Sequence, residues 1–493
     1  MNQLHSINEK EVTTDILIVG AGAAGLKASI EARKSGLNVT LSSKTPKESP
    51  NSSSLAVGWM THVDRETKEE AFKSTVEEGC YLNNQQLVKA FVDDAEREIL
   101  GLTDIGIKLE VREYPWGRGV NRPSKQYLAV SGKPPHGLSI IEALRETAEG
   151  LGVRILYNSI VTGLLTDGGS ISGANVLNLE EGHLRTFRSK AVILATGGGA
   201  KIFGRTDNPV GTTGDGYAIA YRAGAELVDM ELMEFMIPNK DLKKIFGTDL
   251  SREESDLVLS HGGCHYFLGG VKVDEDLMSN LGGLFAAGEV AGGLFGASRL
   301  WGSALADAVA FGARVGSRAT AWVRRGGIDF HDINRDQVEE ERARLGDLLG
   351  ESRTGFDSVE RGIHETMWGL CGVLKDSDSM RLASEALMGL SDEASKMGVS
   401  KESDLGRAVE VVNMLDVAKV IVKAASLRRE SRGAFWRTDY KVSDNENWLA
   451  NIVVGSCNGE PSFEVVPSKM TELRPPSGWV PRIGNHVSGH LNF

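Results

Sequence analysis

The first part of the chain combines short apolar runs with a glycine-rich turn. Residues 15–19 (DILIV) are apolar and rich in β-branched side chains, which predicts a buried strand. The turn GAGAAG follows, and residues 26–35 have a helical composition that Gly36 brings to an end. Residues 38–42 (NVTLS) predict a second strand. A strand, turn, helix and strand in this order make a βαβ unit and indicate an α/β fold.

Helical and strand-like patterns alternate in the middle of the chain, and helices dominate from about residue 332 to residue 425. Helices are predicted over residues 67–105, 139–150 and 303–324, and strands over residues 153–157, 171–177, 184–187, 191–195 and 284–287. The closely spaced strands before residue 195 predict a β-meander. Residues 471–493 carry three prolines and predict an irregular tail or an arm that contacts a partner.

Composition and charge exclude several classes of protein. The 493 residues are 41% hydrophobic, which is typical of a soluble protein with an ample core. The 67 acidic residues outnumber the 55 Lys and Arg, and the resulting net charge of −12 argues against a nucleic-acid partner. No apolar run approaches the roughly 20 residues needed to span a bilayer. Because residues 1–14 are polar, without the apolar core of a secretion signal, we expect a cytoplasmic protein without direct membrane insertion.

The cysteines give no sign of a metal centre. Cys80, Cys264, Cys371 and Cys457 occur without a CxxC or CxxxC pair. This excludes a self-contained iron–sulfur or zinc site of the usual spacing, and we expect no metal. Scattered thiols also fit a reducing compartment.

The GAGAAG turn has the GxGxxG spacing of a dinucleotide-binding site. We expect Gly20 to make the tight turn, Gly22 to let the backbone approach a pyrophosphate, and Gly25 to let helix and strand pack closely. The helix N-terminus supplies amides and a positive dipole end for the phosphates. The alternative is an ordinary glycine-rich turn, which the flanking strand and helix disfavour.

The position that usually contacts a ribose lacks its acid. An Asp or Glu is expected about 20 residues further along, yet the second strand ends in Ser42, Ser43 and Lys44. Ser43 can still form a hydrogen bond with a ribose. The missing acid argues against tight NAD binding.

Five later segments carry a family resemblance. They are ATGGG at 195–199, NPVGTTGDG at 208–216, HYFLGGVKVD at 265–274, GLFAAGEVAGGLFGASRLWGSAL at 283–305 and RRESRGAFWRTDY at 428–440. In this order they resemble the flavoprotein subunits of succinate dehydrogenase and fumarate reductase. L-aspartate oxidase and the flavoprotein subunit of adenylylsulfate reductase belong to the same group. The resemblance extends from about residue 15 to residue 448.

The resemblance implies an FAD whose pyrophosphate lies on the turn from Gly20 to Gly25. It places the ribityl chain near Glu289, the isoalloxazine near the helix that begins at Ser303, and Asp215 among the FAD ligands. A strand-end carboxylate can accept hydrogen bonds from ribityl hydroxyls, and amides at a helix start can stabilise the negative edge of a flavin. The alternative for Glu289 is a solvated acid. The predicted cofactor-binding residues are Gly20, Ala21, Gly22, Ala24, Gly25, Ser43, Lys44, Ser53, Ser54, Ala195, Thr196, Gly197, Asp215, Glu289, Arg299, Ser303, Ala304 and Leu305.

Two departures from the family pattern concern the flavin and the substrate. Respiratory members bond their flavin to a His after the second strand, but here no His occurs between His5 and His62, so the resemblance is to members with non-covalent FAD. Members that handle dicarboxylates have a His-Pro-Thr segment followed by a capping domain with a catalytic Arg. Met236 stands in place of that His, and only 28 residues separate it from His265. Domains rarely have fewer than about 50 residues, so the cap is predicted to be missing or reduced.

A lost cap changes what the site can do, because the cap excludes water and supplies a proton donor. Either another subunit closes the site, or the substrate differs, or the flavin only passes electrons. The predicted catalytic residues are His265 and Arg299, which match the family residues that hold a substrate carboxylate. An Arg fork suits a planar anion. The alternatives are that Arg299 binds a helix end or an acidic neighbour and that His265 is a satisfied core histidine.

Other charged or reactive residues near the predicted site are weaker candidates. Cys264 is predicted to be a buried, inert thiol. Lys240, Lys243, Lys244, Arg252 and His261 lie in the short insert and are individually weak as proton donors or anion ligands. The charges of residues 428–440 predict an ion-pair network that fixes the C-terminal helices to the FAD-binding domain.

The expected fold is α/β, with a Rossmann-like FAD-binding domain containing a β-meander, followed by a mainly helical C-terminal domain. The predicted divisions are 12–235 and 265–328 for the FAD-binding domain, 236–264 for a vestigial capping segment, 329–470 for the helical domain and 471–493 for the tail. The leading function is an oxidoreductase that transfers hydride between flavin N5 and a small anionic substrate and whose partner is an iron–sulfur or other redox subunit. The alternatives are an electron-transferring subunit without its own substrate, or a stand-alone oxidase resembling L-aspartate oxidase.

Overall fold

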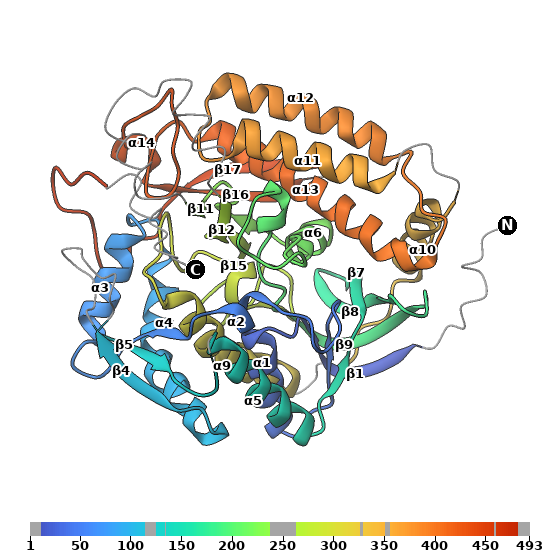
Figure 1. Cartoon of the computed structure of the whole chain (residues 1–493), viewed down its shortest axis with the longest axis horizontal. Helices are drawn as coiled ribbons and strands as arrows, with labels where there is room; N and C mark the ends of the chain where they lie inside the picture. The colour runs from blue at the N-terminus through green and yellow to red at the C-terminus, as the bar shows by residue number, and fades with distance from the viewer. Residues whose placement is uncertain are drawn as a thin grey trace.

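A computed structural model describes residues 11–113, 125–133, 135–236, 263–325, 329–350, 355–457 and 460–481. Figure 1 shows three helices, α11, α12 and α13, packed together along one side of the molecule. Strands β11, β12 and β16 lie in the middle, β4 and β5 at the lower left and β7, β8 and β9 at the right, and helices α1, α5 and α9 lie on the opposite side (Figure 1). Most of the predicted capping segment 236–264 lies outside the described residues, and so do Lys240, Lys243, Lys244, Arg252 and His261.

The largest sheet has seven strands and carries the predicted βαβ unit. Its order is β6-β2-β1-β9-β8-β7, with β14 also paired to β9. Strands β1, β2, β6, β9 and β14 run parallel, whereas β7 and β8 form the antiparallel meander. The bounds are β1 Val12–Val19, β2 Val39–Ser42, β6 Arg154–Leu156, β7 Ser159–Asp167, β8 Ser170–Asn178, β9 Leu184–Leu194 and β14 Leu284–Ala286.

Strand β9 corrects the prediction of two strands over 184–187 and 191–195. The structure has one continuous strand, because the polar residues between the two apolar runs lie where β9 changes its partner. Its first half pairs with β8 and its second half pairs with β14. Arg188 donates to the carbonyl oxygens of Phe330 and His331, so the charge that interrupts the apolar pattern is satisfied outside the sheet.

The helices beside this sheet pack closely through small residues. Methyl groups at Gly312 and Gly316 of α9 would lie 2.7 and 2.5 Å from carbonyl oxygens of α1, so these glycines set the α1–α9 contact. The helices of this part are α1 Ala23–Lys34, α2 Ser52–Leu55, α3 Lys68–Glu78, α4 Gln85–Leu100, α5 Gly137–Gly150, α6 Asp215–Arg222 and α9 Ser303–Arg324. Short 3₁₀ segments are η2 Gly101–Ile105, η3 Ala200–Phe203 and η4 Gly288–Val290. The long helix predicted over 303–324 is confirmed at both ends.

Three smaller sheets complete the strand layer. A three-stranded sheet has the order β3-β5-β4, and a five-stranded sheet has the order β15-β13-β10-β16-β17. Strands β11 and β12 pair antiparallel on either side of residues 237–262, with Met236 opposite Gly263. The bounds are β3 Trp59–Thr61, β4 Leu109–Glu113, β5 Lys125–Ala129, β10 Leu227–Val228, β11 Met233–Met236, β12 Gly263–Phe267, β13 Gly270–Lys272, β15 Ala291–Gly292, β16 Ala450–Cys457 and β17 Glu460–Pro467.

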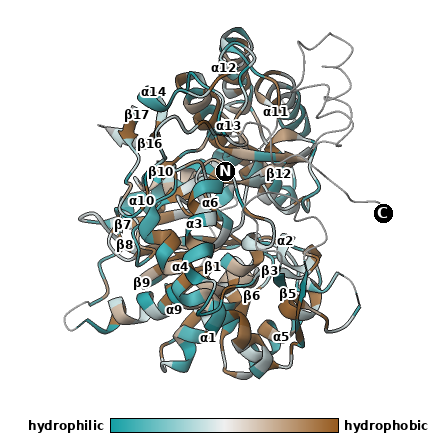
Figure 2. Ribbon diagram, turned by 90° about the vertical axis from the view of Figure 1, so that its left-hand side faces the viewer, coloured by the Kyte–Doolittle hydropathy of each residue, from teal (hydrophilic) through white to brown (hydrophobic). Residues whose placement is uncertain are grey.

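The C-terminal part is mainly helical, as predicted, but it ends in a β-hairpin that the sequence analysis did not predict. Its helices are α10 Arg335–Leu348, α11 Phe356–Cys371, α12 Ser377–Ala394, η5 Glu402–Asp404, α13 Leu405–Leu427 and α14 Asn445–Trp448. Strand β16 of the hairpin pairs with β10, so the chain returns to the FAD-binding part. Helices such as α1, α5 and α12 carry both hydrophilic and hydrophobic residues (Figure 2). None of the described helices is long and apolar enough to cross a membrane.

Candidate functional site

The glycine-rich turn between β1 and α1 has the geometry that its spacing predicts. Gly20 has φ +113°, and a methyl group there would collide with the carbonyl oxygen of Ala195. A methyl group at Gly25 would collide with the carbonyl oxygen of Gly20. At Gly22 the nearest atom would be Oγ of Ser53, at 3.5 Å. Of these three glycines, only Gly22 therefore has room beside it, as an approaching pyrophosphate requires.

Ser53 lies at the entrance of this turn. Its hydroxyl accepts a hydrogen bond from the Ala23 amide at 3.3 Å. Ser54 closes a capping box with Asn51 at the start of α2, so its hydroxyl is used within its own turn. Gly22, the N-cap of α1, provides no side chain to the first helical amides. The other amides of the first helical turn and the proton of the Ser53 hydroxyl are the groups available to a phosphate.

Lys44 and Asp215, predicted as separate cofactor ligands, contact each other. Nζ of Lys44 lies 2.6 Å from Asp215 and 2.7 Å from Glu410 of α13. Burial would lower the pKa of Lys44, but the two carboxylates outweigh it and the pKa is raised. Burial would likewise raise the pKa of Asp215, but Lys44 lowers it. Sequence reasoning missed Glu410, because no local pattern joins positions so far apart in the chain.

Asn413 completes this buried cluster from the same helix. Its amide donates to Asp215 at 2.8 Å and accepts from Arg222 at 2.7 Å. The predicted ribose contact Ser43 is buried, and its hydroxyl donates to the Thr45 carbonyl at 3.2 Å. The end of β2 is therefore fixed to both α6 and α13.

The segment that follows β9 borders Glu289. Gly197 has φ +74° with open space around its Cα, whereas a methyl group at Gly198 would collide with the Glu289 carboxylate. That carboxylate accepts from the Phe267 amide at 2.9 Å. Burial raises the pKa of Glu289 to about 7. Thr196 Oγ1 is buried and has no hydrogen-bond partner among the described residues.

Two side chains that sequence reasoning missed lie at the start of α9. Gln126 of β5 donates to the Trp301 carbonyl at 2.7 Å, and the Thr61 amide of β3 donates to the Gly302 carbonyl at 3.2 Å. Oε1 of Gln126 and Oγ1 of Thr61 are buried, and within the described part of the chain neither has a partner. Buried polar atoms without a hydrogen-bond partner are energetically costly. A ligand with a polar edge, such as a flavin, would supply the missing partners of these two atoms.

The helix start itself offers fewer groups than predicted. The Ser303 amide and hydroxyl both donate to the Leu300 carbonyl. The amides of Ala304 and Leu305 follow Gly302, which has φ +81° and no side chain to cap them. The orphaned atoms of Gln126 and Thr61, the open Gly22 and these two amides together fit an extended FAD.

His265 and Arg299 both have acidic partners. Arg299 donates to Glu234 at 2.8 Å, and its guanidinium lies 4.4 Å from the centre of the Tyr266 ring. Nδ1 of His265 lies 2.7 Å from Asp207. Of the two predicted catalytic residues, His265 therefore lies on β12 and Arg299 lies shortly before the start of α9. Glu234 lies two residues before Met236, and Asp207 directly precedes the segment 208–216. The sequence around these two acids did not predict that they pair with Arg299 and His265.

Burial shifts the pKa of the remaining titratable groups of this site, and for His265 an acidic neighbour reverses the shift. Burial would lower the pKa of His265, but Asp207 reverses the effect and the pKa is raised. Burial raises the pKa of Asp307 on α9 to about 8, and its Oδ1 has no hydrogen-bond partner within the described residues. Burial also raises the pKa of the Cys264 thiol well above its usual value, as expected for an inert cysteine.

The predicted ion-pair network of residues 428–440 is confirmed. Arg428 pairs with Glu231 at 2.7 Å and with Glu430 at 3.1 Å, and all three side chains are inaccessible to solvent. Arg432 pairs with Glu430 at 2.8 Å. Because Glu231 lies just before β11, the network joins the helical part to the strands beside the candidate site.

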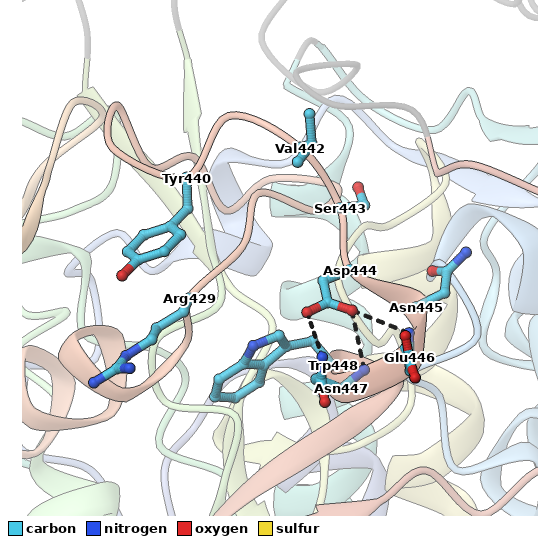
Figure 3. A pocket seen from close by; sticks show the side chains of 9 residues that line it. All are labelled: Arg429, Tyr440, Val442, Ser443, Asp444, Asn445, Glu446, Asn447 and Trp448. Carbon is cyan, nitrogen blue, oxygen red and sulfur yellow. Dashed lines mark hydrogen bonds between the residues drawn. The ribbon is translucent and has the colours of Figure 1, made fainter.

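An open hollow of about 690 Å³ lies over the segment that follows this network (Figure 3). Arg429 and Tyr440 flank one side, and residues 444–448 form the other (Figure 3). Asp444 caps α14 by accepting from the amides of Glu446 and Asn447. The lining shares no residue with the predicted cofactor or substrate set, so we assign no part of the flavin site to it.

Two protein families match parts of the chain. The model described as FAD binding domain matches residues 15–245 and 257–305, and the model described as fumarate reductase flavoprotein C-term matches residues 360–480. An uncharacterised FAD-dependent oxidoreductase of Methanocaldococcus jannaschii is 28% identical over 90% of this chain and 96% of its own. One of the subunits of the CoM/CoB fumarate reductase of Methanothermobacter marburgensis is 26% identical, over 91% and 98% of the two chains.

Solved structures share the fold. FrdA of the E. coli quinol fumarate reductase superposes with a TM-score of 0.84 at 22% identity, covering 94% of this chain and 98% of FrdA. Adenylylsulfate reductase of Archaeoglobus fulgidus superposes with a TM-score of 0.77 at 18% identity, covering 95% and 97% of the two chains.

Proposed function

From the premise that the chain belongs to the FAD binding domain family and carries a fumarate reductase flavoprotein C-terminal domain, we propose that this FAD-dependent oxidoreductase acts on a small anionic substrate. When bound, FAD would accept or donate a hydride at N5. The chain's own residues have to bind the anion and keep water away. His265 and Arg299 would orient it.

One observation carries this proposal. Glu289 accepts a hydrogen bond from the amide of Phe267, two residues after His265 on β12. Burial raises the pKa of Glu289, and the positive charges of nearby His265 and Arg299 partly offset this rise. Glu289 and the start of α9 belong to the predicted flavin site, so the anion-binding candidates lie beside the expected flavin. Glu234 occupies one side of the Arg299 guanidinium, but Nε of Arg299 has no hydrogen-bond partner among the described residues, which favours a substrate over an electron carrier without one.

The replacement of Arg299 by Ala tests the proposal. We expect turnover of any small substrate to fall by about 100-fold or more, because a charged orienting group is lost, while FAD stays bound. Arg314→Ala is a matched control, since Arg314 lies on the same helix and pairs with Asp94 of α4 at 2.7 Å, in a contact outside the site. If Arg299→Ala kept full turnover and full flavin reduction by a redox partner, the electron-carrier alternative would be favoured.

Partners, location and flavin attachment belong to the same proposal. An iron–sulfur or other redox subunit would relay electrons, since relatives of this chain are described as subunits of fumarate reductases. A cytoplasmic location is supported by Cys80, Cys264 and Cys371, which are free buried thiols. The FAD would be non-covalent, because residues 51–54 contain no His.

A further inference from the structure

The guanidinium of Arg299 is held by a cross-strand pair. Glu234 of β11 lies opposite Tyr266 of β12 in the register of the two-stranded sheet. Glu234 pairs with Arg299 at 2.8 Å, and Tyr266 lies against the guanidinium at 4.4 Å from its ring centre. Both ionic side chains are at least nine-tenths buried. The pair is therefore fixed by strand pairing and is not a loose surface contact.

Charges around the expected substrate position cancel. Arg299 is matched by Glu234, and His265 is matched by Asp207 at 2.7 Å. Burial raises the pKa of the two remaining acids, Glu289 to about 7 and Asp307 to about 8, so neither carries a full negative charge at pH 7. No surplus positive charge is left among these described residues. One substrate carboxylate can share the Arg299 guanidinium with Glu234, whereas a second carboxylate would be buried without a positive charge beside it and is strongly disfavoured.

We propose that Glu234 determines substrate specificity, because it supplies a carboxylate of the protein itself to Arg299. The site then takes a small molecule with a single carboxylate and rejects dicarboxylates. This inference rests on the proposed function, in which Arg299 orients an anionic substrate beside the flavin.

The hydrogen-bonding atoms of Arg299 and Glu234 that have no protein partner indicate which other groups the substrate carries. Nε of Arg299 and Oε1 of Glu234 are buried, and neither has a partner among the described residues. Nε–H can donate to the single carboxylate. Oε1 of Glu234 can accept from a hydroxyl, amide or ammonium group of the same molecule, whereas a second carboxylate would face it with like charge.

Propionate and malonate form a matched pair of probes, since both have three carbons and differ in one carboxylate. Each would be titrated into the FAD-loaded protein at pH 7.5, with the flavin absorbance spectrum as the readout. We expect the wild type to bind malonate at least about tenfold more weakly than propionate. Glu234→Gln keeps the shape of the side chain and removes its charge. We expect this variant to bind malonate at least about tenfold more tightly than the wild type does, with propionate changed by less than about threefold.

Glu360→Gln is the control, because Glu360 is paired with Arg407 at 2.6 Å in a separate network. It should leave both affinities unchanged. Wild-type protein that binds malonate as tightly as propionate would overturn the inference even if Glu234→Gln did not fold. Unchanged malonate affinity in a folded Glu234→Gln would also overturn it, and Arg299-dependent propionate binding would then leave the proposed function intact. If neither probe perturbed the flavin of any variant, both proposals would fail.

Discussion

Individual residues of the glycine-rich turn have separate steric duties. Gly25 is closed off by the backbone of Gly20, whereas Gly22 faces open space apart from Ser53. The same residue type therefore serves packing at one position and ligand approach at the other. The spacing of the motif predicted this difference, since Gly20, Gly22 and Gly25 all lie within one βαβ unit.

Gly22→Ala and Gly25→Ala should separate the two duties. Gly25→Ala forces a methyl group into the Gly20 carbonyl, and we expect a loss of about 2 kcal/mol or more in the free energy of unfolding. Gly22→Ala has room for its methyl group, so we expect less than about 1 kcal/mol, together with FAD binding weakened about tenfold or more. Denaturant unfolding of the apoprotein and FAD titration measure both effects. Equal losses of stability in the two variants would contradict this assignment.

Contacts made by tertiary structure escaped prediction at this scale. Glu234, Gln126 and Thr61 belong to short strands from distant parts of the chain. Their partners Arg299, Trp301 and Gly302 follow much later in sequence. A charge or an amide in a short strand has no periodicity that reveals its partner. The contacts of these residues with the start of α9 become visible only when the strands are assembled.

At the scale of elements, helix α13 supports two of the residues predicted to bind the cofactor. Glu410 and Asn413 lie one turn apart on it and hold Lys44 and Asp215. Burial raises the pKa of Glu410 although Lys44 opposes this, so the contact depends on a charge held in a costly environment. The C-terminal helices thus contact residues predicted to bind the cofactor, in addition to packing in the core.

Replacement of Glu410 by Gln should loosen this support. Lys44 keeps Asp215 as a partner, so we expect a moderate loss of about 1–3 kcal/mol in unfolding free energy, together with a lower temperature of FAD release. Lys419→Gln on the same helix is the control, because Lys419 is partly exposed and makes only a long ion pair with Asp416, at 3.9 Å, so its loss should cost less than about 0.5 kcal/mol. Thermal unfolding followed by flavin fluorescence measures both. A Glu410→Gln protein as stable as the control would show that the cluster contributes nothing.

For the whole molecule, local patterns predicted most helices and strands well, but they did not predict the pairing between strands that are far apart in the sequence. The βαβ unit, the helix Ser303–Arg324 and the helical C-terminal part followed from apolar periodicity and family motifs. The hairpin of β16 and β17 did not, since β16 is stabilised by pairing with β10, more than two hundred residues earlier. The sequence pattern predicted two strands in place of β9, because Arg188 and Lys190 interrupt its apolar residues, although both lie within one continuous strand.

The last prediction at this scale concerns whether the protein binds FAD covalently or non-covalently. No His occurs in the segment that carries the covalent bond in respiratory relatives, so we predict that acid precipitation releases the flavin. The supernatant should be yellow and contain intact FAD in proportion to the protein. A yellow pellet that keeps its colour after washing in denaturant would contradict the prediction, and a covalently flavinylated protein processed in parallel is the control.

The pairing of Met236 with Gly263 has a consequence for how this family diversifies. Strand pairing keeps the two Cα atoms about 5 Å apart, however many residues lie between them. A longer connection adds only a small closure entropy. Evolution can therefore insert, shorten or exchange a domain at this point while the flavin framework stays unchanged. A capping domain transplanted from a relative would find its two attachment points already side by side.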